Sequence, residues 1–273
     1  MNSRCRCRTI YGPFWLCSEP GSKPHHFRTR MNDTTAKPLN VFSVTFKLLT
    51  FRLSQQEILQ FDGRLLAFGL VCTWLVGIGR YWDHPNAKLL QYLGVGSVAY
   101  VFILSLFLWL VLWPLKPKNW SYRNLLTFIS LVSPPALLYA IPVERWFSFE
   151  TATKLNVWFL VIVASWRVAL LVFYLKRSSE LSFGELVVAT FLPLTIIVFA
   201  LVELNLEGAV FEIMAGIRRS RTANDAAYRF LFTLALLSYL CIVPLFIAYV
   251  TIVSQKWSAT RERRAKNSSP QQE

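Results

Sequence analysis

Six stretches of apolar residues follow one another along the chain, each bounded by polar or charged positions. They cover residues 65–79, 89–112, 125–143, 155–175, 186–204 and 230–253. A bilayer core about 30 Å thick needs about 20 apolar residues in a helix, so the first stretch crosses only if its flanks lie at the interfaces. The pattern predicts an all-α fold, a polytopic transmembrane helix bundle over residues 63–255. We expect six spans, or five if the first or fifth stretch fails to cross.

A different pattern precedes the first span, in a lead-in over residues 31–62. Polar residues recur there at spacings of four, three and four, at Ser43, Lys47, Thr50 and Ser54. Apolar residues repeat the same spacing, each one position before a polar one, at Phe42, Phe46, Leu49 and Leu53. This spacing predicts an amphipathic helix lying in the headgroup plane. Ser54-Gln-Gln-Glu57 follows as a capping box, which predicts the start of a new helix.

Both ends of the chain lack apolar stretches. Residues 1–30 are rich in arginine, cysteine and proline and contain no run of signal-peptide length, so we expect either a mis-assigned start, with translation from Met31, or a disordered tail. Residues 256–273 are polar and basic, which predicts a disordered cytoplasmic tail.

The composition excludes most classes of soluble protein. Hydrophobic residues make up 54% of the chain and charged residues 16%, too apolar for one water-soluble core. The net charge of +14 does not indicate nucleic-acid binding, because the cations flank the apolar stretches, where they meet lipid headgroups. Their distribution favours an inner-membrane protein with both termini in the cytoplasm. Membrane lipids are the partners that this charge implies.

Arg167 is the residue with the clearest functional signal. It lies inside the fourth stretch, and a charge there costs about 2.5–3.5 kcal/mol on insertion scales. At about 1.5 Å per residue, it lies roughly 12 Å from the inner end of that stretch. The residues expected at this depth in the other spans are Thr73, Ser105, Ser133, Pro134, Pro193, Thr195 and Pro244.

Two interpretations of this level remain open. Interior prolines remove a donor, so Pro134, Pro193 and Pro244 leave carbonyls that a guanidinium with five donors could bind. A kinked polar midplane layer around Arg167 is one hypothesis. The other is that the prolines only bend their helices and that Arg167 snorkels or pairs for packing. Function that survives Arg167→Leu, with stability equal or greater, would favour the second.

A second polar cluster is expected at the outer face. It comprises Arg80, Asp83, His84, Glu144, Arg145 and Glu203. These residues could form an ion-pair network or a solute mouth, but solvated helix caps and interfacial anchors are the favoured interpretation. No third ligand is fixed by spacing beside Asp83 and His84, so we predict no metal site. Known catalytic and cofactor-binding motifs are also absent from the sequence, which predicts a protein that is not an enzyme and needs no cofactor.

Gly69, Thr73 and Gly77 recur at every fourth position of the first span. Such a ladder of small residues lets another helix approach closely. Packing within the bundle is the favoured use, and a protein partner or a homo-oligomer is the alternative.

Two resemblances to known families follow from short motifs. Ile78-Gly-Arg-Tyr-Trp-Asp-His-Pro85, together with the segment from Ser133-Pro-Pro to Val143-Glu-Arg145, resembles uncharacterised bacterial multi-pass inner-membrane proteins. Leu48-Leu-Thr-Phe-Arg-Leu-Ser54 and Tyr11-Gly-Pro-Phe-Trp15 are similar to motifs of the Yip family, although here the second motif does not lead straight into a span. The Yip resemblance implies a role in membrane organisation through partner binding.

Two functional classes therefore remain. The first is a non-enzymatic membrane organiser or partner-binding protein. The second is a small-solute transporter or permease with its site around Arg167. The sequence favours the organiser slightly, because no inverted repeat of broken helices is visible.

Overall fold

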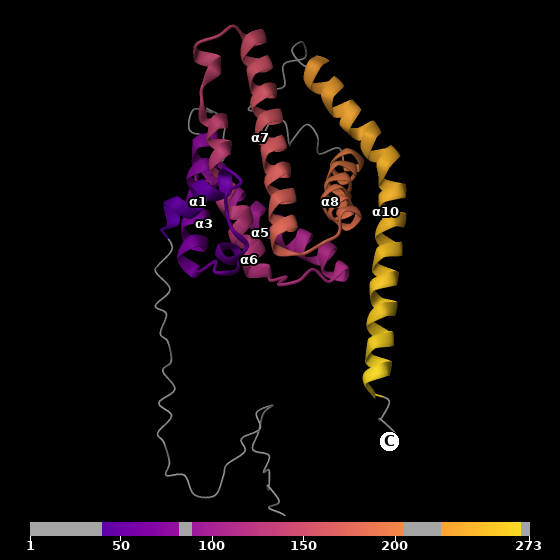
Figure 1. The fold of residues 1–273 in the computed structure, drawn as a ribbon. Helices are drawn as coiled ribbons and strands as arrows, with labels where there is room; N and C mark the ends of the chain where they lie inside the picture. The colour runs from indigo at the N-terminus through magenta and orange to yellow at the C-terminus, as the bar shows by residue number, and fades with distance from the viewer. Residues whose placement is uncertain (1–39, 82–88, 205–224, 269–273) are drawn as a thin grey trace, which may run out of the picture. The chain divides into compact units, whose positions relative to one another are not determined.

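The computed structural model describes residues 40–81, 89–204 and 225–268, and every regular element within these ranges is helical (Figure 1). Four helices are long and apolar enough to cross a membrane: Val95–Leu115, Glu150–Ser178, Phe183–Glu203 and Thr233–Glu262. The prediction of an all-α membrane protein is confirmed at this level. Residues 1–30 lie outside the described residues.

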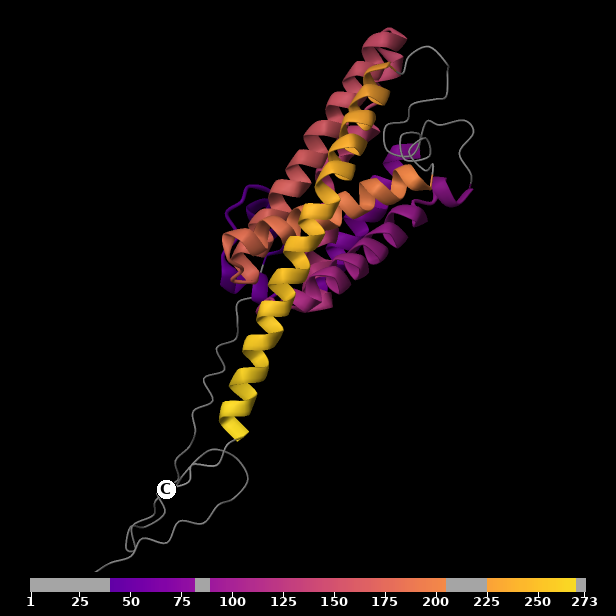
Figure 2. The same cartoon turned by 90° about the vertical axis from the view of Figure 1, so that its right-hand side faces the viewer.

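The elements follow one another as α1 (Val41–Leu49), α2 (Gln55–Leu59), α3 (Gly63–Tyr81), α4 (Leu89–Tyr92), α5 (Val95–Leu112), η1 (Trp113–Leu115), α6 (Tyr122–Leu131), η2 (Pro134–Ala140), η3 (Val143–Arg145), α7 (Phe149–Ser178), α8 (Phe183–Glu203) and α10 (Asp225–Ser268). Helix α3 packs against α5, α6 and η2, and α7 packs against η2 and α8. Helix α10 lies beside α8, as Figures 1 and 2 both show.

Helix α1 presents apolar side chains on two faces. Val44 and Leu48 are buried against the rest of the protein, whereas Phe42 and Phe46 are 73% and 64% exposed. A helix that is packed on one side and bears exposed phenylalanines on the other suits a membrane interface. Its placement in the headgroup plane stays a prediction.

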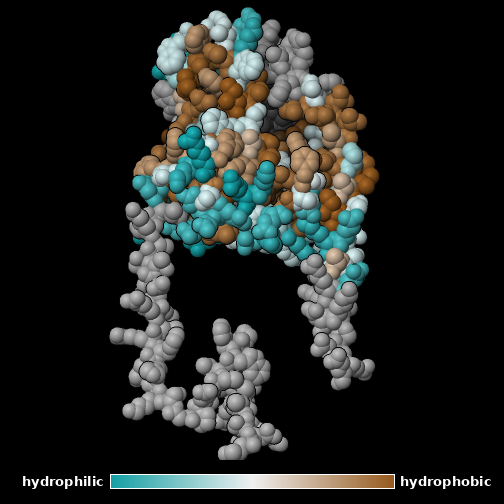
Figure 3. Space-filling model, viewed as in Figure 1, coloured by the Kyte–Doolittle hydropathy of each residue, from teal (hydrophilic) through white to brown (hydrophobic). Residues whose placement is uncertain are grey.

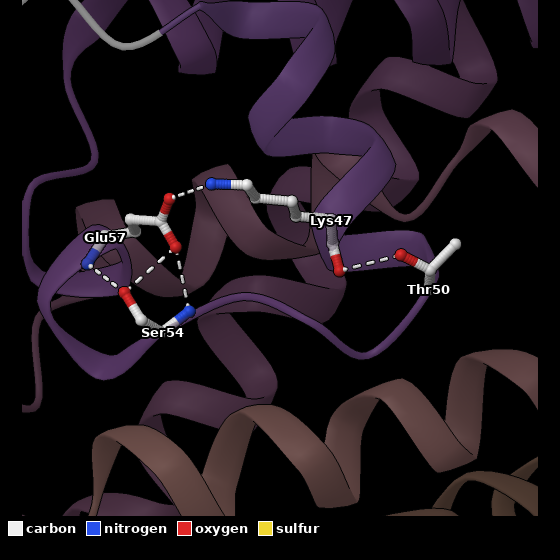
Figure 4. A network of polar contacts seen from close by, with 4 residues as sticks. All are labelled: Lys47, Thr50, Ser54 and Glu57. Atoms are coloured by element: carbon white, nitrogen blue, oxygen red, sulfur yellow. Dashed lines mark hydrogen bonds and ion pairs between the residues drawn. The ribbon is translucent and has the colours of Figure 1, made fainter.

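A capping box joins α1 to α2, as the sequence predicted (Figure 4). The backbone N–H of Ser54 donates to Glu57 Oε2 at 2.9 Å, and the N–H of Glu57 donates to Ser54 Oγ at 3.3 Å. Lys47 of α1 donates to the other carboxylate oxygen, Oε1, at 2.7 Å. These hydrogen bonds, that from Lys47 first, lower the pKa of Glu57 below its ordinary value.

This lowered pKa predicts a pH-dependent contribution to stability. The contribution is fully present above the ordinary pKa of glutamate, about 4.3, and is lost as the pH falls through the lower pKa of the folded protein. We expect wild type to unfold at a higher temperature than Glu57→Gln at pH 6, and the difference to shrink steadily towards pH 3. Thermal unfolding of the two proteins in detergent measures it. A gap that stays constant over this range would contradict the assignment.

Gly69, Thr73 and Gly77 pack inside the chain. A Cβ at Gly69 would lie 2.4 Å from Ser130 Oγ of α6, and one at Gly77 would lie 2.8 Å from Ser97 Oγ of α5. Between them, Thr73 is buried against the same segment as Gly69. The ladder thus brings α3 close to two of its neighbours, which is the favoured use predicted above.

The second predicted stretch is helical over less of its length than expected. Its long helix, α5, begins at Val95, and α4 is a separate short helix. Gly94 interrupts them with φ +67°, and a Cβ there would lie 2.7 Å from the carbonyl oxygen of Trp74. Trp74 Nε1 in turn donates to Leu93 O at 2.7 Å. Close approach to α3 therefore sets the start of α5, which apolar patterning alone does not reveal.

The predicted disordered tail is helical over most of its length. Helix α10 continues through the end of the apolar stretch to Ser268, and Figure 2 shows this part running on past α8. Alanine, arginine, lysine and glutamate dominate residues 259–266, and these are strong helix formers.

Hydrophilic side chains also gather along one edge of the visible face in Figure 3, below a largely hydrophobic surface.

Candidate functional site

The third predicted stretch is a broken helix. Helix α6 ends at Leu131, and the chain continues as the 3₁₀ helix η2 from Pro134. Pro134 and Pro135 have no backbone N–H, so the α-helical ladder cannot continue through them. The sequence predicted a kink here, and the structure replaces the expected continuous helix with two short ones. Irregular backbone at membrane depth is tolerated where protein buries it or where it lines a water-filled cavity.

Three hydroxyls beside the break satisfy one another and the backbone. Thr73 and Ser133 form a hydrogen bond between their side chains at 2.6 Å, and Thr73 Oγ1 also donates to Gly69 O at 2.9 Å. Ser130 Oγ donates to Thr127 O at 2.9 Å. All of these residues are buried. The sequence predicted Thr73 and Ser133 at one depth and a carbonyl of Ser130 freed by Pro134, but it did not include the hydroxyl of Ser130 in the layer.

Arg167 lies on the packed face of α7. Val163, Leu170 and Tyr174 are buried there, and the spacings of four, three and four place Arg167 on their stripe. Arg167 itself is partly buried. Within the described part of the chain, no hydrogen bond or ion pair joins it to another residue.

The level of Arg167 coincides with the break in the third stretch. On one side of it, Val163 packs with Ala136 of η2. On the other side, the ring of Tyr174 stacks on Phe128 of α6 with centroids 4.2 Å apart. The two contacts run antiparallel, so Arg167, which lies between Val163 and Tyr174, faces the part of the third stretch between Phe128 and Ala136, which contains the break.

Two buried carbonyls at the break accept no hydrogen bond from the described residues. The positions three and four residues after Leu131 are both prolines, so no N–H is available to its carbonyl at either helical spacing. The residue three positions after Val132 is Pro135, which has no N–H to donate to the Val132 carbonyl. The residue four positions after it, Ala136, donates its N–H to Ser133 O instead, at 2.9 Å. No hydrogen bond in the described ranges reaches either oxygen. Such groups normally find a partner, so they mark a place where one is expected.

The other residues of the predicted midplane layer do not join this group. Ser105 Oγ donates to Val101 O at 2.7 Å, and Thr195 Oγ1 donates to Leu192 O at 2.8 Å, both within their own helices. Pro193 is buried inside α8. Pro244 lies inside α10 and is exposed, so it does not pack with the hydroxyls around Thr73. Equal depth fixes the level of a residue in the membrane, but the helical rotation decides which way it faces.

The predicted outer-face cluster falls largely outside the described residues. Asp83 and His84 lie there, as do the side chains of Arg80 and Glu144. Glu203 accepts a hydrogen bond from the hydroxyl of Tyr239 on α10. Arg145 is exposed at the end of η3. Among the described residues, no group of three possible metal ligands is found.

A second capping box, which was not predicted, lies at the start of α8. The N–H of Ser182 donates to Glu185 Oε2 at 3.1 Å, and Lys256 of α10 forms an ion pair with Glu185 Oε1 at 2.8 Å. Lys256 also donates to Leu115 O at 2.8 Å. The same S-x-x-E pattern that marked Ser54 is present at Ser182 and could have revealed it.

Comparisons with protein-family models, with curated proteins and with solved structures found no match.

Proposed function

We propose that the protein carries small solutes that bear an anionic group across the membrane, with Arg167 and the α6–η2 break as its recognition site. The observation that carries this proposal is their coincidence at one level: a cation without a bonded partner in the described ranges, on the packed face of α7, opposite a break with two open carbonyls. Ionisable residues inside a membrane are costly and usually serve a solute or an ion. Broken helices near the midplane are the recurrent binding elements of transporters.

The proposed topology has six crossings. Helix α3 and the broken segment α6–η2–η3 would cross in addition to the four long helices. The loops assigned to the cytoplasm are in contact: Lys118 pairs with Glu180, and Lys116 donates to Thr260 Oγ1 at 3.0 Å. Such contacts are expected if these loops share one side of the membrane. With the excess of cations there, we place both termini in the cytoplasm of a cell with an inner membrane.

Membrane organisation through partner binding, as in the Yip family, is the second candidate. It is favoured by the hydroxyls of Thr73, Ser130 and Ser133, which satisfy one another and the backbone as in a filled bundle. A filled bundle, however, should also bond Arg167 to neighbouring carbonyls, and no such bond is present in the described ranges. Transport activity separates the two.

Arg167→Leu should strongly lower transport. The test is uptake into proteoliposomes of radiolabelled inorganic phosphate and of a panel of small carboxylates, amino acids included. A hydrogen bond to a charged group contributes about 1.5–3 kcal/mol, so its loss should lower uptake about 10- to 100-fold. The matched control is Arg177→Leu, which removes an exposed cation from the end of the same helix. Uptake equal in Arg167→Leu and wild type, or no uptake of any probe by wild type, would contradict the proposal.

A further inference from the structure

The α6–η2 break offers two kinds of hydrogen-bonding group to a ligand. The carbonyls of Leu131 and Val132 can only accept, and the guanidinium of Arg167 can only donate. All three are without a partner in the described part of the chain. A ligand that satisfied every one of them would need an anionic group together with hydrogen-bond donors.

A simple anion does not fit both halves of this site. It would satisfy Arg167, but its lone pairs would face the partial negative charges of the two carbonyl oxygens. An ammonium group fits the carbonyls, since three N–H donors can reach two acceptors, but alone it would be repelled by the guanidinium. A zwitterion places both charges in one small molecule.

We propose that the site binds a small zwitterion, with its carboxylate on Arg167 and its ammonium on the carbonyls of Leu131 and Val132. An α-amino acid is the simplest molecule of this kind. This inference rests on the proposed transport function and names the substrate class of the same site.

The depth of the site separates a soluble zwitterion from a lipid. A zwitterionic phospholipid such as phosphatidylethanolamine carries the same pair of charges on its headgroup. Arg167, however, lies about 12 Å along the helix from Leu175, the last apolar residue of its stretch, and therefore near the middle of a hydrocarbon core about 30 Å thick. Headgroups lie at the surface of that core, so the soluble source is the one proposed.

The hydroxyls beside the break support the same assignment. Ser130 O, the carbonyl freed by Pro134, already accepts from the N–H of Ser133 at 3.2 Å and from Thr73 Oγ1 at 3.4 Å. The carbonyls of Leu131 and Val132 do not share in this network. The open acceptors are therefore confined to two adjacent residues, which suits one small group.

The test is the thermal stabilisation of the full-length protein in nanodiscs by matched ligands. The panel contains α-amino acids, the carboxylates that lack the amino group, such as propionate for alanine, and the corresponding amines. Discs made with and without phosphatidylethanolamine separate the lipid source. We expect at least one amino acid to raise the unfolding temperature with a Kd about tenfold or more below that of its matched carboxylate. Arg177→Leu should respond as wild type does, and Arg167→Leu should not respond.

Pro135→Ala tests the role of the carbonyls separately from that of Arg167. Alanine restores an N–H four residues after Leu131, which can occupy that carbonyl. We expect this variant to remain folded and to bind the matched carboxylate, but to lose most of its preference for the amino acid. Pro193→Ala in α8 is the control for removal of a proline and should keep the preference.

Each contrary outcome has a distinct meaning. Equal binding of carboxylate and amino acid overturns the zwitterion proposal and leaves anion transport standing. Stabilisation by phosphatidylethanolamine alone overturns the soluble source. No response to any ligand, together with no uptake in proteoliposomes, overturns both the inference and the proposed function.

Discussion

Alanine at Gly69 lowers the unfolding temperature of the protein by several degrees. The added Cβ would lie 2.4 Å from Ser130 Oγ and 3.0 Å from the backbone nitrogen of Leu131. The hydroxyl cannot swing away without loss of its hydrogen bond to Thr127 O, so α3 and α6 must separate. Overpacking of this kind costs about 1–3 kcal/mol, which exceeds the gain of about 0.5–1 kcal/mol that alanine brings to a helix.

Gly96→Ala is the matched control for this prediction. Gly96 lies in α5, and a Cβ there meets no atom within 4 Å. Without a clash, only the higher helix propensity of alanine over glycine remains, so the unfolding temperature of Gly96→Ala should equal or exceed that of wild type. Thermal unfolding of both variants in the same detergent measures the difference. Equal behaviour of the two would contradict the close approach of α3 to α6.

Methionine at Lys256 should loosen α10 from the rest of the chain. Lys256 is 27% exposed and its partner Glu185 is 17% exposed, so much of each charge is removed from water. The substitution removes the ion pair and the hydrogen bond to Leu115 O and leaves Glu185 without its partner. We expect a loss of about 1–3 kcal/mol, together with faster proteolysis at the ends of α10.

Lys154→Met serves as the control for the loss of a lysine. Lys154 pairs with Glu150 within α7, where the side chains are 63% and 80% exposed. Exposed pairs contribute at most about 1 kcal/mol, so stability should change little. Glu185→Gln should reproduce most of the Lys256→Met effect. A loss of stability at Lys154 as large as that at Lys256 would argue against a specific role for the Lys256 pair.

Patterns that depend on near neighbours in the sequence predicted the structure well. The four-residue spacing of Gly69, Thr73 and Gly77 predicted a close helix approach, and the first capping box was predicted from Ser54 and Glu57 alone. Long apolar stretches predicted four of the helices. In each case the cause lies within a few residues of its effect.

Features that depend on rotation or on distant contacts were missed or wrong. Gly94 shortens the second stretch because Trp74, on another helix, approaches it. Pro244 lies at a plausible depth, but its position on α10 leaves it exposed. For Arg167 the sequence predicted a depth, and only the packing of Val163 and Tyr174 assigned the residue to a face of α7. The position of a residue along an apolar stretch predicts how deep the residue lies in the membrane. It does not predict which way the residue faces around the helix axis.

The two capping boxes differ in when they can form during synthesis. Lys47 precedes Glu57 by ten residues, so that ion pair can close before any spanning helix has left the ribosome. Glu185 must wait for Lys256, which is translated only after the apolar stretch of α10. Until then the carboxylate at the start of α8 lacks this lysine. Helix α10 thus completes the start of α8, which couples the synthesis of one helix to the packing of another.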